Sequence, residues 1–88
     1  MQEKVLKIKN KLGLHARPAA LMVQTAGKFK SKIKIVKDAQ EVDGKSIMGL
    51  MTLAACAGTD LRIIAEGEDE AEALNALGAL VESGFGEE

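Results

Sequence analysis

The only histidine and the only proline of this chain are three residues apart, where a helix is expected to begin. His15 and Pro18 flank Arg17, and strong helix formers continue to Ala26. Proline is tolerated in a first helical turn because the amides there need no partner within the helix, so Pro18 marks the helix start. His15 then lies at or beside the N-cap, where free backbone N–H groups and the helix dipole form an anion site. The spacing predicts a histidine placed beside a bound phosphate-like group.

The charges around this histidine predict its reactivity. The helix dipole and the Arg17 guanidinium both disfavour the imidazolium form, so we expect a largely neutral, nucleophilic ring near neutral pH. A neutral imidazole can attack phosphorus, and the segment of Ala16, Arg17 and Pro18 would then hold the transferred oxygens. The residues alone also allow a simpler interpretation, in which His15 is a surface residue at a helix start with no chemistry.

A second candidate site is Ser46, in the tripeptide Gly44-Lys45-Ser46. This tripeptide resembles the end of a nucleotide-binding P-loop, but position 39, where such a loop needs its first glycine, is Ala39. A chain of 88 residues is also too short for the accompanying nucleotide-binding sheet, so we reject this interpretation. Ser46 instead suits the N-cap of a short helix. A phosphoryl group on Ser46 would meet the amides of that helix start, so regulatory phosphorylation is a hypothesis beside simple capping.

The short helix expected after Ser46 carries more apolar residues than one buried stripe needs. These residues are Ile47, Met48, Leu50 and Met51. Some of them should face solvent or a partner, and methionine suits an adaptable docking surface. The alternative is that all four belong to the core.

The remaining pattern predicts the elements that position these residues. Alternating apolar residues indicate strands at 5–9, 32–36, 40–43 and 59–65. Helical spacing indicates helices at 16–26, 47–53 and 70–81, the last with a capping box formed by Asp69 and Glu72. This order predicts an α+β open-faced sandwich, a four-stranded antiparallel sheet with three helices on one face. We expect a single domain, residues 1–88, with a loosely held tail after Ser83.

Composition argues against several classes of function. Twelve basic and thirteen acidic residues give a net charge of −1, so nothing suggests nucleic acid or membrane binding. The chain has no Trp or Tyr for base stacking, and its single histidine fits no metal site, so we expect neither metal nor cofactor. No signal peptide or membrane-spanning segment is recognisable. Cys56 is the only cysteine, which suggests a small buried residue in a cytoplasmic protein, and we expect a monomer.

Two stretches of the chain resemble one protein family. The first resembles the active-centre motif of HPr and consists of Asn10-Lys11-Leu12-Gly13-Leu14-His15-Ala16-Arg17-Pro18-Ala19-Ala20. HPr is the histidine phosphocarrier family of the bacterial phosphoenolpyruvate:sugar phosphotransferase system. The resemblance extends over nearly the whole chain and includes Gly44-Lys45-Ser46-Ile47-Met48-Gly49-Leu50-Met51. It is poor at residues 37–41 and after Val81, which leaves any role of the C-terminal carboxylates open.

The resemblance implies a stoichiometric phosphoryl carrier, not an enzyme. His15 would accept a phosphoryl group at Nδ1 from phosphorylated enzyme I and donate it to the histidine of an enzyme IIA domain. Arg17 would stabilise the transferred group. Ser46 matches the serine that HPr kinase/phosphorylase modifies, which slows phosphoryl flow and in some bacteria creates a corepressor for a transcriptional regulator.

The resemblance also implies where partners bind. Ile47, Met48 and Met51 match the apolar helix that enzyme I and other partners contact. We expect Leu14 to belong to the same docking surface.

Three alternatives remain beside the sugar-system carrier. One is the nitrogen-type phosphotransferase paralogue, which takes its phosphoryl group from a dedicated enzyme I. Another is a mainly regulatory HPr-like corepressor, although such proteins lack the histidine that this chain keeps as His15. The third is a small α+β ligand- or RNA-binding module, which would call for a more basic or aromatic surface.

Overall fold

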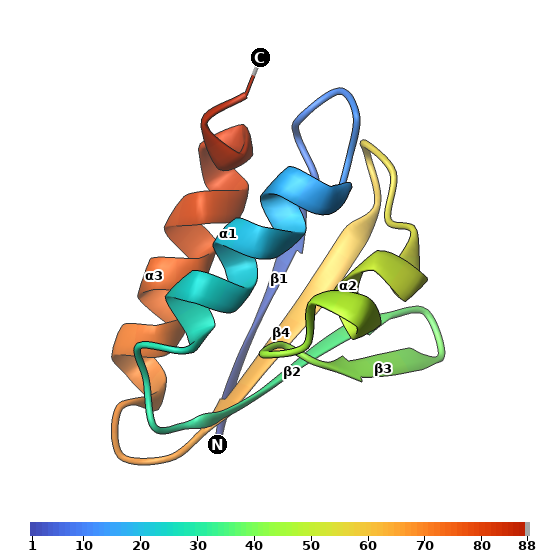
Figure 1. Ribbon diagram of the computed structural model, residues 1–88. Coiled ribbons are helices and arrows are strands. Elements are labelled where there is room, and N and C mark those ends of the chain that lie inside the picture. Colours follow the sequence, from blue (N-terminus) through green and yellow to red (C-terminus); the bar gives the residue numbers. More distant parts are fainter. Residues whose placement is uncertain (88) are drawn as a thin grey trace.

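The computed structural model describes residues 1–87. Over this range the chain forms, in order, β1 (Gln2–Lys7), α1 (Ala16–Ala26), β2 (Lys32–Lys37), β3 (Gln40–Asp43), α2 (Ile47–Leu53), β4 (Asp60–Glu66), α3 (Glu70–Glu82) and a 3₁₀ turn (Gly84–Gly86). Figure 1 shows the arrangement of these elements.

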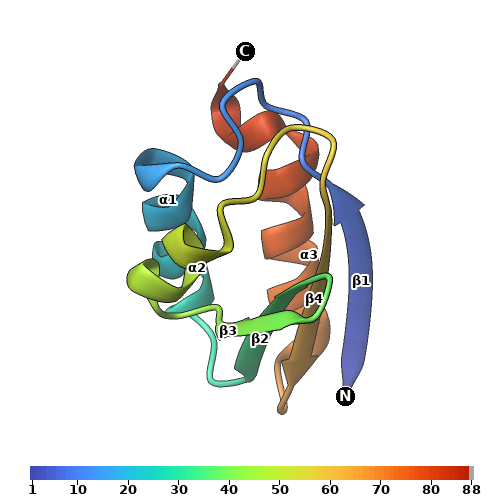
Figure 2. The same ribbon diagram turned by 90° about the vertical axis from the view of Figure 1, so that its right-hand side faces the viewer.

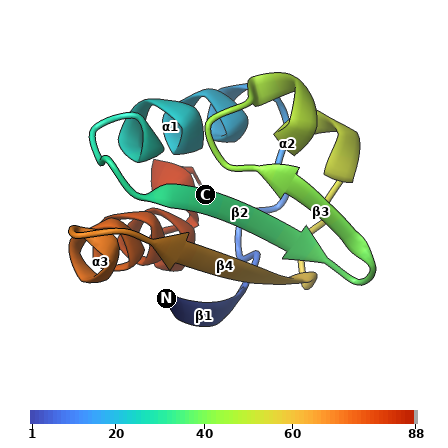
Figure 3. The same cartoon turned by 90° about the horizontal axis from the view of Figure 1, so that it is seen from below.

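The strands form one antiparallel sheet in the order β1-β4-β2-β3. Strand β4 is central and pairs with both β1 and β2, so the last strand of the chain joins the first strand to the β2–β3 hairpin. The helices cover one face of the sheet, as the two rotated views show (Figures 2 and 3). The predicted open-faced sandwich is therefore confirmed.

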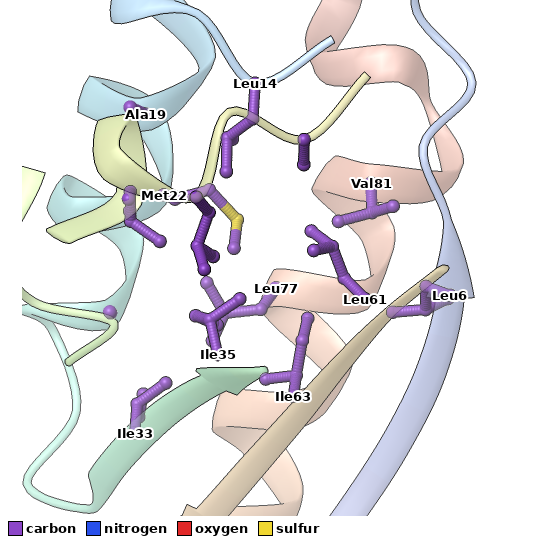
Figure 4. Close-up of a cluster of buried hydrophobic side chains, with 14 of the residues drawn as sticks. Leu6, Leu14, Ala19, Met22, Ile33, Ile35, Leu61, Ile63, Leu77 and Val81 are labelled. Carbon is purple, nitrogen blue, oxygen red and sulfur yellow. The ribbon is translucent and has the colours of Figure 1, made fainter. Parts of the chain in front are cut away.

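The core lies between the sheet and the helices, and the strand pattern explains its composition. Ile33 and Ile35 alternate with exposed lysines on β2, and Ile35 is directly opposite Ile63 of β4. Their side chains meet Leu77 of α3 and Met22 of α1 in one buried cluster (Figure 4). Burying each such side chain contributes about 1.5–3 kcal/mol, so this cluster fixes α1 and hence His15 against the sheet.

The bounds of β1 differ from the prediction, and the structure shows how the predicted hairpin turns. The edge strand β1 covers residues 2–7 and not 5–9, and Ile8 instead bonds to the loop before β4 through Ile8 N–H to Thr59 C=O at 2.8 Å. The β2–β3 hairpin lacks an Asn-Gly turn. Its turn is made by Asp38, which adopts a left-handed conformation with φ of 53°.

Two expectations about side chains were wrong. Asp69 makes no side-chain capping bond to α3, because its carboxylate accepts bonds from the Lys30 and Ser31 amides of the α1–β2 loop. Cys56 is exposed and not buried, and it lies in the segment between α2 and β4 next to the buried Ala55.

Candidate functional site

His15 is the N-cap residue of α1. Its backbone is extended (φ −86°, ψ −170°), its side chain makes no capping bond, and the helix begins at Ala16. Pro18 occupies the third helical position, within the first turn as its missing N–H requires. The ring is half-buried, with 36% of the side chain exposed. A partner can therefore reach the imidazole from solvent.

The loop before His15 has a fixed shape because of Gly13. This glycine has φ of +70°, and a Cβ atom placed on it would lie 2.3 Å from the carbonyl oxygen of Ala55. The next amide, of Leu14, donates to that same carbonyl at 2.8 Å. Only glycine allows so close an approach in this conformation. The segment after α2 thus holds the loop that presents His15.

The start of α1 offers positive groups beside the ring. The amides of Ala16 and Arg17 belong to the first turn, whose donors have no acceptor within the helix. Both residues are exposed, and the Arg17 side chain adds a guanidinium. Pro18 is buried and has no N–H, so it shapes the helix start without donating to an anion. A phosphoryl group on His15 would find its donors at Ala16 and Arg17.

The C-terminal tail reaches this site, which the sequence did not predict. Nε2 of His15 lies 3.0 and 3.1 Å from the two carboxylate oxygens of Glu87. Asn10 Nδ2 donates to Glu87 Oε1 at 2.9 Å, and Phe85 is buried with 4% exposure. Figures 1 and 2 both show the C-terminal turn beside the loop before α1. The expectation of a loosely held tail was therefore wrong for residues 84–87, while Glu88 lies outside the described residues. The apolar Phe85 between two glycines was the available signal.

The tail changes the electrostatics of the site. The hydrogen bonds from His15 and then Asn10 lower the pKa of Glu87 below its ordinary value of 4.5, and the charge of Arg17 acts in the same direction. Glu87 is therefore ionised at neutral pH. The prediction of a neutral ring considered only the positive groups near His15, whereas the structure adds a negative one.

Beside His15 lies a shallow apolar hollow of about 280 Å³. It connects the ring to the end of α2 and is lined by Leu12, Leu14, His15, Ala16, Met51, Ala54, Ala55 and Cys56. The hollow places an apolar surface next to the reactive ring.

The predicted docking residues divide into exposed and buried ones. Ile47, Met48 and Met51 are exposed by 40%, 74% and 45%. Leu14 is only 3% exposed and points into the core, so its assignment to an exposed surface was wrong (Figure 4). Leu12, which the prediction omitted, is 73% exposed at the rim of the hollow.

Ser46 is the N-cap residue of α2. Its hydroxyl oxygen accepts a hydrogen bond from the Gly49 amide at 3.1 Å. The hollow beside His15 is bounded by Met51 and the residues after it, so Ser46 lies at the opposite end of α2. A helix of seven residues is about 10 Å long, so Ser46 lies about that far from the end of α2 that borders the hollow.

The described part of the chain offers neither a metal-binding cluster nor a membrane-spanning helix. Within residues 1–87, no group of three or more His, Cys, Asp or Glu side chains is placed to hold a metal ion. None of the helices in this range has the length and apolar character to cross a bilayer.

Comparison with known proteins identifies the family. The family model described as PTS HPr component phosphorylation site matches residues 2–83. The chain belongs to the HPr family. The phosphocarrier protein HPr of Treponema pallidum is 48% identical over 88 residues, which cover 100% of both chains. The HPr-like protein Crh of Halalkalibacterium halodurans is 54% identical over 82 residues, covering 93% of this chain and 98% of Crh.

A solved HPr structure agrees closely with the fold. HPr-C-His from Thermoanaerobacter tengcongensis has a TM-score of 0.96 and 57% sequence identity, covering 100% of this chain and 99% of that one. The part matched by the HPr family model contains His15 and Ser46 but ends at residue 83, before Glu87. The tail contact therefore lies outside the range that the family model matches, while the alignments to the Treponema pallidum and Thermoanaerobacter tengcongensis proteins span the whole chain.

Proposed function

We propose that this protein is a cytoplasmic phosphocarrier whose His15 receives a phosphoryl group from phosphorylated enzyme I at Nδ1 and passes it to the histidine of an enzyme IIA domain. The observation that carries the proposal is a half-exposed imidazole at the uncapped start of α1, in a chain of the HPr family. The protein acts as a stoichiometric carrier and is recovered unchanged after each cycle, and it works as a monomer.

The chemistry at α1 fits transfer in both directions. The amides of Ala16 and Arg17, with the guanidinium, hold the phosphoryl oxygens without closing over them. A carrier must meet two partners in turn, so an open site suits it better than an enclosed pocket. In-line transfer between two imidazoles depends mainly on positioning, which the fixed loop at Gly13 provides.

The docking surface of the proposal is formed by Leu12, Ile47, Met48 and Met51. All four residues are exposed, and Leu12 and Met51 line the hollow beside His15. Enzyme I and enzyme IIA would both cover this apolar surface while the two imidazoles face each other. Methionine side chains suit contacts with more than one partner because they adapt their shape.

Ser46 provides regulation in this proposal. HPr kinase/phosphorylase would phosphorylate it at the far end of the docking surface from His15. The added charge would oppose an incoming phosphorylated partner and slow the carrier. A second candidate function is a mainly regulatory role through Ser46 and a transcriptional regulator, favoured by the relative named HPr-like protein Crh at 54% identity. The presence of His15 favours the carrier.

The test uses phosphoenolpyruvate labelled in its phosphoryl group and purified enzyme I. Wild type should take up acid-labile label, His15→Ala none, and Ser46→Ala as much as wild type. Ser46→Asp should label more slowly, by roughly 5- to 10-fold, since 1.4 kcal/mol of repulsion corresponds to a tenfold change. Label that resists acid, or that survives His15→Ala, contradicts the carrier function.

The same assay separates the two phosphotransferase branches. Enzyme I of the sugar system and its nitrogen-type counterpart are supplied in turn, and the two rate constants are compared. We expect faster transfer from the sugar-system enzyme. Faster transfer from the nitrogen-type enzyme would assign the chain to that paralogue.

A further inference from the structure

We propose that Glu87 is a positioning residue that holds a proton on Nε2 of His15 and so reserves Nδ1 for the phosphoryl group. This inference rests on the proposed function of His15 as a phosphoryl acceptor. It concerns a residue outside the range that the family model matches.

The contact occupies one edge of the imidazole. Both carboxylate oxygens of Glu87 lie within hydrogen-bond distance of Nε2, at 3.0 and 3.1 Å. An ionised carboxylate can only accept, so the proton between the two groups belongs to Nε2. In the neutral ring the free lone pair is then on Nδ1. Glu87 also covers Nε2 against an approaching phosphorus atom.

The carboxylate is held in place by groups on two other segments. Asn10 is 2% exposed, and its Nδ2 donates both to Glu87 Oε1 at 2.9 Å and to the Gly13 carbonyl at 2.7 Å. Buried Phe85 anchors the turn before Glu87, and the Glu87 amide donates to Gly84 C=O at 3.0 Å. The same asparagine thus links the tail to the loop that presents His15. This arrangement orients the ring before any partner binds.

The proton inventory of the transfer step explains why the contact is useful. The Nδ1 lone pair forms the new N–P bond, and the bond from phosphorus to the donor's imidazole nitrogen breaks with its electron pair. Nε2 keeps its proton, so the phosphorylated ring becomes a cation and no proton has to leave. The carboxylate of Glu87 offsets that positive charge. When phosphorus departs to the next partner, the ring returns to the neutral Nε2–H form.

A small phosphoryl donor tests this assignment without any protein partner. Phosphoramidate phosphorylates imidazoles directly, with ammonia as the leaving group, and NMR of ¹⁵N-labelled protein shows which ring nitrogen carries phosphorus. Wild type should give the Nδ1 product alone. Glu87→Ala should give a mixture that contains the Nε2 product, and Glu87→Gln should restore Nδ1 selectivity because its amide oxygen can still accept from Nε2. His15 is the only histidine, so no other ring contributes.

A second readout uses enzyme I and phosphoenolpyruvate. Glu87→Ala should slow phosphorylation by on the order of 10-fold, the lower end of the effect seen when a metal-binding histidine loses the carboxylate that orients it. Glu87→Gln should recover part of the rate by restoring the ring orientation without the charge. The control is Glu82→Ala, which removes a carboxylate at the same end of α3 that pairs with Lys9 and not with His15. This control should react like wild type.

The outcomes separate this inference from the proposed function. Failure of wild type to accept phosphate from enzyme I would defeat the carrier proposal, while the phosphoramidate products would still report on Glu87. An Nε2 product in wild type, or only the Nδ1 product in Glu87→Ala, would overturn the positioning role. A mixture in Glu87→Ala that Glu87→Gln corrects supports it.

Discussion

Two helices of this protein begin in different ways. At the start of α2, the Ser46 hydroxyl accepts a hydrogen bond from the Gly49 amide. At the start of α1, His15 makes no capping bond, and its ring contacts Glu87 instead. The start of α2 is stabilised by its own chain, whereas the start of α1 keeps donors for an external anion. In the proposed function, a phosphoryl group on His15 supplies the acceptors that the start of α1 lacks.

The same difference predicts how the two ends respond to a phosphoryl group. At His15 the group would add acceptors to a helix start that lacks them. At Ser46 it would replace a hydroxyl that already accepts the Gly49 amide, so the helix gains less and the main effect is a new charge on the docking surface. Transfer chemistry therefore suits the first site and regulation suits the second.

The largest expected effect comes from Gly13→Ala, which disturbs the loop that presents His15. A methyl group at this position meets the Ala55 carbonyl oxygen at 2.3 Å while the backbone is at φ of +70°. Strain and overpacking together should lower the free energy of unfolding by about 2–4 kcal/mol. Denaturant unfolding measures this loss, and slower phosphorylation of His15 should accompany it.

Gly49→Ala is the matched change at α2. Its Cβ would approach the Val42 Cβ at 3.1 Å, which is tight, but alanine gains up to about 1 kcal/mol of helix propensity. The two contributions oppose each other, so the free energy of unfolding should change by less than about 1 kcal/mol. An equal loss in both glycine variants would show that the loop before His15 is no more constrained than α2.

The start of α3 adds a third case, with an expected effect that depends on pH. Asp69 makes no capping bond, and hydrogen bonds from the Ser31 hydroxyl and the Lys30 amide lower its pKa below 3.8. At pH values well above 3.8, the ionised carboxylate therefore makes its full contribution to the free energy of unfolding. This contribution is lost as the pH falls through the folded-state pKa. Asp69→Asn should be less stable than wild type at pH 7, and the difference should shrink on acidification.

Denaturant unfolding at about pH 7 and pH 3 measures this change. Glu68→Gln is the control, because it removes a carboxylate from the exposed turn next to Asp69. A difference between Asp69→Asn and wild type that stays constant with pH would contradict the role given to the ionised carboxylate.

Much of the fold could be predicted because its signals are local. Alternation of lysine and isoleucine on β2 gives both the strand and its buried face, and Pro18 with Gly27 bounds α1. Contacts between distant segments were not predictable in the same way. Asp69 was assigned to a capping box by its spacing to Glu72, but its carboxylate bonds to residues 38 and 39 positions earlier in the chain.

The candidate site shows the same limit. Residue types and spacing located His15 at the helix start, since proline and the helix formers are its sequence neighbours. Leu14 was assigned to the docking surface, yet its side chain is buried and its amide donates to the carbonyl of the distant Ala55. Glu87 was missed because its contact with His15 spans 72 positions, and nothing near His15 in the sequence indicates a negative partner.

The smallest effects compare the two N-cap residues directly. Ser46→Ala removes the acceptor for the Gly49 amide and should lower the free energy of unfolding by about 1 kcal/mol. His15→Ala removes no capping bond but does remove the contact with Glu87, so it is made in the Glu87→Ala background. In that background its loss should be under about 0.5 kcal/mol, the usual range for a surface substitution. Thermal or denaturant unfolding of both variants, without phosphate in the buffer, makes the comparison. If His15→Ala proved as costly as Ser46→Ala, the start of α1 would depend on its histidine for stability, and its donors would not be held open for a phosphoryl group.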